Sequence, residues 1–303
     1  MEMKDPENIM LDSVTPLNLE SRYLPSEEDV NFYRKHGWLI TPKILADELI
    51  EEGMAGLEQH WSGHRDKQLP VNEGYVDWMP GDGDGTRNNE YISLQNRRVQ
   101  KLAWHPLIGE IAARLAGSDT IRLFDDQIVC KPPSQTRSSV GWHVDGDYWG
   151  TCSSYQLLTA WIPFHDCPEE LGPLAVIDGS HEWSHEIDRK KLSFHSQDMN
   201  SLARLVEETG RRFICKPLSM GRGQMSFHHC RTIHGSFPNR SSQPRIALAL
   251  HMQDGSNRYK SCVRADGRPV QLFNDRICRK DLDGLPDYSD DAVFPVLYRS
   301  VQV

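Results

Sequence analysis

The sequence of 303 residues lacks the long apolar runs that mark a membrane span or a secretory leader. No window approaches the roughly 18 apolar residues that a membrane-spanning helix needs, and the N-terminal MEMKDPENIM has no basic segment followed by an apolar one. The C-terminal YRSVQV does not match a peroxisomal address. We therefore expect a protein without a membrane segment that works in the cytoplasm.

Cysteine pairs and positive charge are also scarce. The seven cysteines form no CxxC pair and no regular framework, and their odd number fits a reduced compartment, so we expect free thiols. The formal net charge is −9, with 43 acidic against 34 basic residues. Because nucleic-acid binding depends on basic patches that displace counterions from phosphates, this balance argues against a nucleic-acid partner. A small-molecule substrate is the better expectation.

Helical patterns dominate the first part of the chain, after an arm at residues 1–24 that shows little periodicity. Ser26 is followed by three acidic residues and Gly37 ends the pattern, which predicts a helix over 27–36. The spacing of apolar residues predicts further helices over these ranges: 46–61, 106–118 and 198–210. We expect a single domain over residues 25–303.

From residue 120 onward, short β-rich segments are separated by glycine, proline or serine. They include TIRLFDDQIVCKP, YQLLTAWIPFHD, GPLAVI, RRFICKPLS, GQMSFHH and PRIALALHMQ. Short strands without regular strand-helix alternation indicate an antiparallel barrel or jelly roll, with the earlier helices packed outside. We expect a polar loop over 80–90, where glycines cluster, and irregular surface structure from about residue 270.

The stretch GWHVDGDYWG places a histidine and an acid two positions apart. Alternate side chains of an extended strand share a face, so His143 and Asp145 can point at one ion while the residue between them faces away. Two ligands do not make a metal site, and the best third candidate is His234 in FHHCRTIHGSFPNR. His228 and His229 in the same stretch stay open as competitors for that role.

Two imidazoles and one carboxylate on one face of an ion leave the opposite face open, as in the non-haem Fe(II) oxygenases. A 2-oxo acid can chelate the metal at open positions and leave one for O₂. Its distal carboxylate then needs a buried cation, for which arginine offers a planar, bidentate fork. Arg245 lies eleven residues after His234 and opens the apolar strand RIALAL, where an unpaired guanidinium would be costly. We therefore expect an anionic partner for Arg245.

With these motifs the sequence resembles the phytanoyl-CoA dioxygenase (PhyH) family of Fe(II)/2-oxoglutarate oxygenases. That family has a WHxD segment, a later HGS followed by PN and S, and an arginine about eleven residues after the histidine. In this chain these motifs are Trp142-His143-Val144-Asp145, His234-Gly235-Ser236, Pro238-Asn239, Ser241 and Arg245. Further motifs of the family also match. Its glutamine is Gln127, its Lys-Pro stretch is Lys131-Pro132, and its tryptophan eighteen residues after the first ligand is Trp161. Its GPL and GSH segments are residues 172–174 and 179–181.

The resemblance implies a double-stranded β-helix, a jelly-roll variant of cupin type, that binds Fe(II) through His143, Asp145 and His234. It implies 2-oxoglutarate and O₂ as co-substrates. The residues that it places at the 2-oxoglutarate are Arg245, Ser236, Gln127 and Trp161. Two positions depart from the family's usual sequence, because Val144 replaces a frequent glutamine and Asp178 a usual proline. Neither removes a ligand, but Val144 indicates that the acyl-CoA substrate should not be carried over.

The substrate is a small molecule, and a natural-product intermediate would suit a chain with eight tryptophans and nine tyrosines. The residues expected to line its pocket are Tyr148, Trp149, Trp78, Met79 and His251. Related halogenases replace the carboxylate ligand by a small residue so that chloride can bind, whereas Asp145 fills that position here. Hydroxylation is therefore favoured over halogenation, and desaturation, epoxidation and cyclisation stay open.

One rival class of protein shares the same ligands. It is a cupin-like metal protein that binds a small ligand without redox turnover, or one that holds zinc for hydrolysis. Arg245 discriminates between the two classes, because a hydrolytic zinc site has no need of a buried cation placed for a dicarboxylate.

Overall fold

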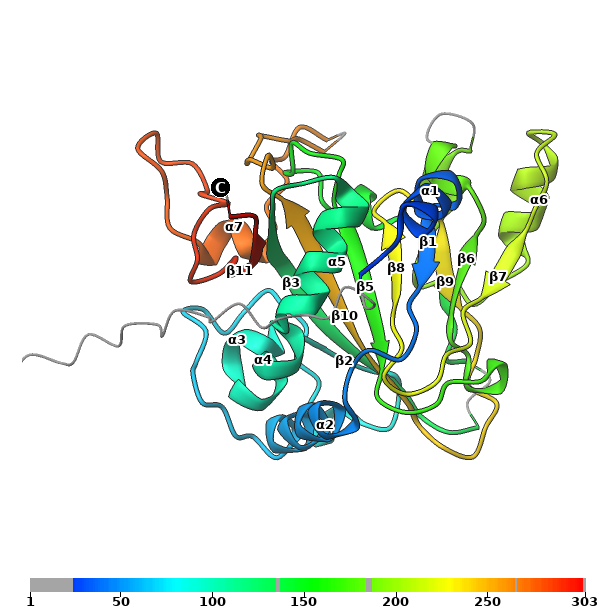
Figure 1. The fold of residues 1–303 in the computed structure, drawn as a ribbon, viewed down its shortest axis with the longest axis horizontal. Helices are drawn as coiled ribbons and strands as arrows, with labels where there is room; N and C mark the ends of the chain where they lie inside the picture. The colour runs from blue at the N-terminus through cyan, green and yellow to red at the C-terminus, as the bar shows by residue number, and fades with distance from the viewer. Residues whose placement is uncertain (1–23, 135–136, 184–186, 265, 302–303) are drawn as a thin grey trace, which may run out of the picture.

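Most helices precede most strands along the chain (Figure 1). The structure, a computed structural model, describes residues 24–134, 137–183, 187–264 and 266–301. Its α-helices are Glu27–His36 (α1), Asp47–Trp61 (α2), Ile92–Gln95 (α3), Arg97–Ala103 (α4), Pro106–Ala116 (α5), Ser201–Glu207 (α6) and Phe273–Ile277 (α7). Its strands are Trp38–Ile40 (β1), Arg87–Glu90 (β2), Thr120–Lys131 (β3), Val140–His143 (β4), Leu158–Pro163 (β5), Leu174–Ile177 (β6), Cys215–Pro217 (β7), Ser226–His229 (β8), His234–Ser236 (β9), Arg245–Asp254 (β10) and Val296–Arg299 (β11).

The strands form two antiparallel sheets. The larger sheet has seven strands in the order β1-β8-β5-β10-β3-β11, with β2 also paired to β3. The smaller sheet has four strands in the order β4-β9-β6-β7. In Figure 1 the long strands β3 and β10 lie side by side behind α5, and β6, β7 and β9 stand at the other side of the molecule. The expectation of a mainly antiparallel β protein with flanking helices is confirmed.

Side-chain alternation along β10 separates the two faces of the larger sheet. Ile246, Leu248 and Leu250 point outward into the largest apolar cluster, where they pack with Ile108 and Ile111 of α5. Ala247 and Ala249 instead join a second cluster that includes Leu174 and Val176 from the smaller sheet. The helices therefore cover the outer face of the larger sheet, and its inner face looks toward the smaller one.

The predicted helices agree closely with the structure where local signals are strong. Ser26 caps α1 through a capping box with Asp29, and Gly37 ends the helix with φ +79°, a left-handed conformation that favours glycine. The predicted ranges 46–61 and 106–118 correspond to α2 and α5. Of the helix predicted over 198–210, only Ser201–Glu207 (α6) is helical. The arm predicted over 1–24 lies, except for Leu24, outside the described residues.

Two segments differ from the sequence-based expectation. The end of the predicted loop 80–90 forms β2, which pairs with β3 from Arg87 opposite Cys130 to Glu90 opposite Gln127. The chain after residue 270 is also not irregular surface structure, because it contains α7 and β11. Its Phe294 is fully buried and stacks on Phe124 with ring centroids 5.7 Å apart. Both segments take up regular structure through contacts with residues far away in the sequence. Local composition could not reveal these contacts.

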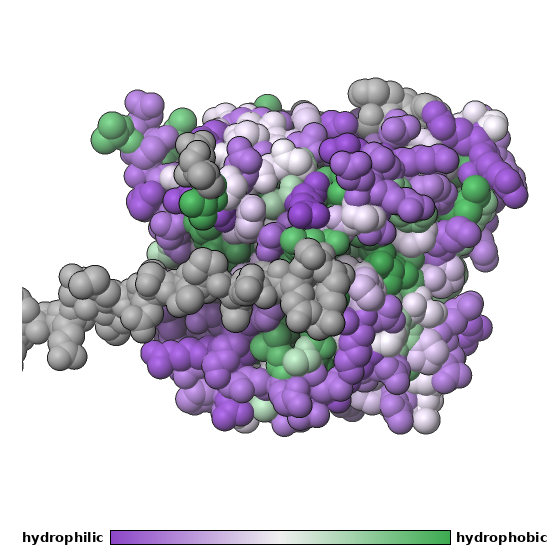
Figure 2. All heavy atoms as spheres, viewed as in Figure 1, coloured by the Kyte–Doolittle hydropathy of each residue, from purple (hydrophilic) through white to green (hydrophobic). Residues whose placement is uncertain are grey.

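The described surface contains no helix that is long and apolar enough to cross a membrane. Most of the face seen in Figure 2 is hydrophilic, with smaller hydrophobic patches between. All seven cysteines are free thiols, five of them buried. The expectation of unpaired cysteines is therefore confirmed.

Candidate metal and co-substrate site

The inner face of the larger sheet carries its polar residues in rows that run across the strands. Thr159 on β5 lies opposite His228 on β8 and opposite His251 on β10. His251 in turn lies opposite Asp125 on β3. Because directly opposed residues of antiparallel strands share a face, these four side chains line one row of the inner wall.

A second polar row lies further along the same face. Arg245 at the start of β10 stands opposite Lys131 at the end of β3. Between the two rows β10 contributes only the small side chains of Ala247 and Ala249 to this face. Two small side chains of β10 therefore separate the row of Thr159, His228 and His251 from the Arg245-Lys131 row.

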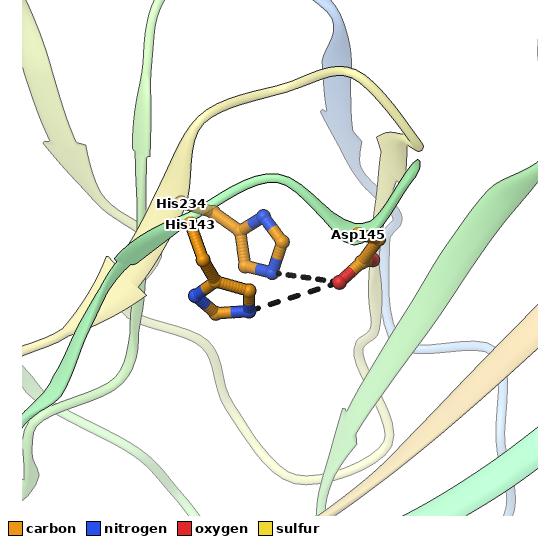
Figure 3. Close-up of side chains that lie close together, drawn as sticks. All are labelled: His143, Asp145 and His234. Atoms are coloured by element: carbon orange, nitrogen blue, oxygen red, sulfur yellow. Dashed lines mark ion pairs between the residues drawn. The ribbon is translucent and has the colours of Figure 1, made fainter. Parts of the chain in front are cut away.

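Three side chains converge in Figure 3. They are His143 from β4, Asp145 from the turn after β4 and His234 from β9. Asp145 Oδ1 lies 3.3 Å from His234 Nε2 and 3.7 Å from His143 Nε2. The three potential ligand atoms all lie within 4.8 Å of one another. Ligand atoms that share one ion at about 2.1 Å stand roughly 3 Å apart, so this group fits a divalent metal. The buried Val144 points away into a separate apolar cluster, as the alternation predicted.

Backbone carbonyls fix the tautomers of both histidines. His143 Nδ1–H donates to the carbonyl oxygen of Gly141 at 2.8 Å, and His234 Nδ1–H donates to that of Thr232 at 3.0 Å. A carbonyl oxygen can only accept, so in each neutral ring the proton is on Nδ1 and the lone pair is on Nε2. Both lone pairs therefore lie on the nitrogen that faces Asp145.

Two donors occupy the second oxygen of Asp145. Thr159 Oγ1–H donates to Asp145 Oδ2 at 2.7 Å, and His228 Nε2–H donates to the same oxygen at 3.2 Å. Because the Thr159 hydroxyl has one hydrogen, it accepts its second contact, at 2.8 Å, from Nδ1–H of His251. Oδ1 alone is left for a metal. His228 is thus a hydrogen-bond partner of the Asp145 carboxylate, and the group of three potential ligands contains His234 rather than His228 or His229.

The charges of the group are strongly coupled. Burial favours the uncharged form of Asp145, yet His234 and then His228 outweigh burial and hold the pKa of Asp145 well below its usual range. Burial and then His234 lower the pKa of His143 to about 3, and the same causes lower the pKa of His228 to about 4. Burial opposes the charged form of His234, but Asp145 outweighs burial and raises the pKa of His234 above its usual value. The ionised carboxylate therefore faces one neutral imidazole, His143, and one imidazole, His234, whose proton it favours, and a divalent metal that binds here displaces that proton.

Arg245 is buried without a carboxylate partner among the described residues. Its side chain is 2% exposed, its Nη1–H donates to the Val129 carbonyl at 3.2 Å, and its buried Nε has no hydrogen-bond partner there. Its guanidinium carbon lies 5.5 Å from the centre of the Trp161 ring. Gln127 lies two inward rows away from Arg245, opposite Ala249 on the same face. A buried guanidinium with an unused donor fits the distal carboxylate of a 2-oxo diacid.

Ser236 approaches the Arg245-Lys131 row from the smaller sheet. It follows His234 by two residues on β9, so both side chains face inward. Its hydroxyl lies 2.6 Å from Lys131 Nζ on the larger sheet. The structure thus brings His143, Asp145 and His234 together in one group. It places Trp161 beside Arg245 and adds Thr159 at Asp145 and Lys131 at Ser236. The assignment of these residues to a metal and a co-substrate stays a prediction.

Aromatic side chains surround the opening beside His143. The Tyr148 and Phe194 rings lie 5.5 Å apart, and each is 6.2 Å from the His143 ring. Both are exposed, by 43% and 38%. Trp149 is buried deeper and its ring lies 5.0 Å from His251. Two exposed rings therefore lie beside a buried polar group.

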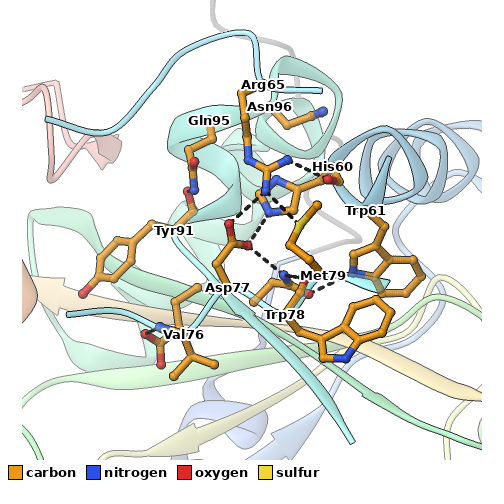
Figure 4. A network of polar contacts seen from close by, with 12 residues as sticks. His60, Trp61, Arg65, Val76, Asp77, Trp78, Met79, Tyr91, Gln95 and Asn96 are labelled. Atoms are coloured by element: carbon orange, nitrogen blue, oxygen red, sulfur yellow. Dashed lines mark hydrogen bonds and ion pairs between the residues drawn. The ribbon is translucent and has the colours of Figure 1, made fainter. Parts of the chain in front are cut away.

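Trp78 and Met79 belong to a network beside α2 (Figure 4). Asp77, the residue before them, accepts from His60 Nε2–H at 2.6 Å and from Arg65 at 2.8 Å. Met79 lies against Arg65, with a nitrogen-to-sulfur distance of 3.6 Å. No contact given for the described residues joins Trp78 or Met79 to the metal group, so their place in the substrate pocket stays a prediction.

Thr159, Lys131 and Phe194 were not recognised as site residues from the sequence. Lys131 stands in a Lys-Pro pair of the family pattern, and Thr159 lies two residues before Trp161 on the same strand face. Both signals indicated an inward side chain. Phe194 carried no signal, because it reaches His143 from a segment that lies outside both sheets.

A mainly β protein with an inward His-Asp-His group and a buried arginine matches the class of non-haem, 2-oxoglutarate-dependent oxygenases. The profile of the phytanoyl-CoA dioxygenase (PhyH) family matches residues 33–247. The chain therefore belongs to the PhyH family of Fe(II)/2-oxoglutarate oxygenases.

Individual relatives agree with this assignment. The probable alpha-ketoglutarate-dependent hypophosphite dioxygenase of Stutzerimonas stutzeri is 28% identical over 135 residues, which is 44% of this chain and 45% of that enzyme. The chain thus spans less than half the length of that relative. The 1-deoxypentalenic acid 11-beta-hydroxylase of Streptomyces exfoliatus is 24% identical over 241 residues, covering 75% of this chain and 80% of the hydroxylase.

Among solved structures, the epimerase SnoN in complex with Fe³⁺, alpha ketoglutarate and nogalamycin RO has a similar fold. Its TM-score is 0.66 at 22% identity, and the match covers 89% of this chain and 98% of SnoN.

Proposed function

We propose that the protein is an Fe(II)- and 2-oxoglutarate-dependent dioxygenase that hydroxylates a C–H bond of a small molecule, with release of succinate and CO₂. Two features support this proposal together. The side chains of His143, Asp145 and His234 converge within 4.8 Å of one another. On the inner face of the larger sheet, Arg245 is buried without a carboxylate partner among the described residues. The second feature carries the proposal, because a hydrolytic zinc site does not require a buried arginine placed for a dicarboxylate.

The proposal includes finer points of fold and place. We propose that the two sheets form the double-stranded β-helix of this family and that residues 25–303 make a single domain. The inward rows of the larger sheet and the ligands on the smaller one support this arrangement, because the site lies between the sheets. The free cysteines support a reducing, cytoplasmic location.

In this account His143, Asp145 and His234 hold Fe(II), and Arg245 with Ser236 holds the distal carboxylate of 2-oxoglutarate. Bound iron, with 2-oxoglutarate and O₂, supplies the oxidising power for C–H cleavage. The chain's own part is to orient these groups. Thr159 and His228 occupy Oδ2 of Asp145, so that only Oδ1 is left to bind the metal. The hydrogen bonds from Nδ1–H to backbone carbonyls hold the His143 and His234 rings with Nε2 facing the metal site. Trp161 packs beside Arg245 and helps to exclude water from the distal carboxylate.

The substrate enters beside Tyr148 and Phe194 in this proposal, with Trp149 and His251 deeper in the pocket. Exposed rings at the mouth favour a small molecule with a broad apolar or aromatic face, such as a natural-product intermediate. Because Asp145 occupies the carboxylate position, hydroxylation is preferred to halogenation. The relatives include a hydroxylase and an epimerase, so the class of product is a separate question from the oxidising centre.

Succinate formation tests the proposal. The purified protein is incubated in air with Fe(II), 2-oxoglutarate and fractionated small-molecule extracts, and succinate is measured with and without a metal chelator. We expect chelator-sensitive succinate together with a product one oxygen atom heavier than its precursor. Tight stoichiometric zinc without succinate in any fraction would favour the rival metal protein.

A further inference from the structure

Lys131 is the most deeply buried cation near the site, and the proposed function gives it no task. Its side chain is 0% exposed and lies at the end of β3, directly opposite Arg245 on β10. Its Nζ reaches across to the smaller sheet. It lies 2.6 Å from Ser236 Oγ, 3.2 Å from the Ser236 carbonyl and 2.7 Å from the Phe237 carbonyl.

These three contacts determine the direction of the Ser236 hydroxyl. In its charged form Lys131 has three hydrogens and no lone pair, so the ammonium group donates to all three oxygens. Ser236 Oγ is therefore an acceptor toward Lys131, and its own hydrogen points elsewhere. Among the described residues no acceptor takes that hydrogen. The Ser236 hydroxyl hydrogen is therefore free to be donated to a ligand between the two sheets, on the side where His234 and Arg245 also point.

The positive charge beside Ser236 also favours a bound anion. Lys131 and Arg245 are neighbouring buried basic groups, and no carboxylate among the described residues forms an ion pair with either. Burial, and then the charge of Arg245, hold the pKa of Lys131 well below its usual range, so an anion bound beside the two groups would favour the charged form of Lys131. Two like charges in a low-dielectric interior are costly unless an anion joins them. A carboxylate placed between Arg245 and the Ser236 hydroxyl would offset both charges.

We propose that Lys131 is a positioning residue for 2-oxoglutarate: it aims the Ser236 hydroxyl at the distal carboxylate and adds a second positive charge behind Arg245. The inference rests on the proposed function, since it needs a 2-oxo diacid in the cavity. Lys131 makes no direct contact with the co-substrate in this account, because its three hydrogens are already used. It acts through Ser236.

Lys131 also joins the two sheets, so a purely structural role is the alternative. The two roles differ in which 2-oxo acids they affect. Pyruvate carries the same metal-chelating 2-oxo acid group as 2-oxoglutarate but lacks the distal carboxylate. A positioning role lowers the affinity for 2-oxoglutarate and spares pyruvate. Loss of the sheet contact would weaken both ligands alike.

The experiment measures binding rather than turnover. Wild type and Lys131→Met are loaded with Mn(II), and 2-oxoglutarate or pyruvate is titrated in by calorimetry. We expect Lys131→Met to bind 2-oxoglutarate on the order of ten- to hundred-fold more weakly, as for loss of a charge-assisted contact. Its pyruvate affinity should stay within about twofold of wild type. Lys216→Met, which removes an exposed lysine from β7 of the smaller sheet, is the matched control and should change neither.

Ser236→Ala makes the test independent of how well the lysine variant folds. Alone it should also reduce the preference for 2-oxoglutarate over pyruvate. In the double variant the two losses should be clearly less than additive, because Lys131 acts through the hydroxyl that Ser236→Ala removes. Lys131→Gln, which keeps neutral donors, should fall between Met and wild type.

The outcomes separate the inference from the function on which it rests. If Ser236→Ala keeps the full preference for 2-oxoglutarate, or Lys131→Met weakens both acids equally, Lys131 is structural and the inference is wrong. If wild type itself binds neither 2-oxo acid beside the metal, the proposed function fails first.

Discussion

The two hydrogen bonds to Asp145 Oδ2 predict that Thr159→Val weakens metal binding. Valine keeps the shape of threonine and removes the hydroxyl that lies 2.7 Å from this oxygen. Without it the carboxylate is less firmly oriented, and His251 loses the acceptor that its Nδ1–H contacts at 2.8 Å. The altered side chain is not a ligand, so any effect on the metal passes through Asp145.

The expected magnitude follows from the contacts that remain. Hydrogen bonds to charged groups contribute about 1.5–3 kcal/mol, and loss of a partner of a metal ligand costs roughly 10- to 100-fold in metal affinity. His228 still donates to Oδ2 at 3.2 Å after the substitution. We therefore expect the lower end of this range, about 1.5 kcal/mol or roughly tenfold.

The assay is a titration with Mn(II), whose free form is counted by electron paramagnetic resonance. Thr151→Val is the matched control, because Thr151 is also buried and its hydroxyl contacts Tyr288 at 2.7 Å, away from the metal group. Thr151→Val should bind Mn(II) as wild type does. Unchanged or tighter binding in Thr159→Val would refute the reasoning, since it would mean that Oδ2 is free to coordinate the metal.

Three further predictions concern the ligands, the co-substrate and the stability of the helical part. His143→Ala and His234→Ala should each abolish Mn(II) binding and succinate formation while circular dichroism keeps the wild-type signal, because a 303-residue chain does not depend on one ion for its core. Arg245→Lys should need roughly 10- to 100-fold more 2-oxoglutarate with unchanged Mn(II) affinity, since the bidentate fork is lost; equal 2-oxoglutarate binding would make Arg245 structural. Burial raises the pKa of Asp77, but hydrogen bonds, first from His60, outweigh it and lower the pKa from 3.8 to about 2. Its folded-state pKa lies below the unfolded value, so about 2 kcal/mol of stability present above about pH 4 should be lost as the pH falls toward 2. Urea unfolding at both ends of this range should show the loss in wild type and not in Asp77→Asn.

The group of three potential metal ligands was predictable from sequence because its signals are local. His143 and Asp145 share a strand face by spacing alone, and His234 stands in a motif that continues to Arg245. The helix α1 was predictable for the same reason, since Ser26 and Gly37 mark its two ends within one short segment. In each case neighbouring residues carry the information.

The unrecognised features depend on partners far along the chain. The polar sequence of β2 has no apolar alternation, and it becomes a strand only because β3 supplies its hydrogen bonds. Lys131 meets Ser236 across 105 positions, and His228 reaches Asp145 across 83. Spacing cannot reveal such contacts. The pairing of β5 with β8 and β10 is what turned Thr159 toward the carboxylate.

The central claim is that this chain holds Fe(II) and 2-oxoglutarate together between its two sheets. The most direct measurement is an anaerobic titration of the Fe(II)-loaded wild type with 2-oxoglutarate, followed by the charge-transfer absorption of the chelate. The account predicts a saturable band with one 2-oxoglutarate per chain that is absent in His234→Ala and needs much more 2-oxoglutarate in Arg245→Ala. No band in the wild type, or an equally tight band in Arg245→Ala, would contradict it.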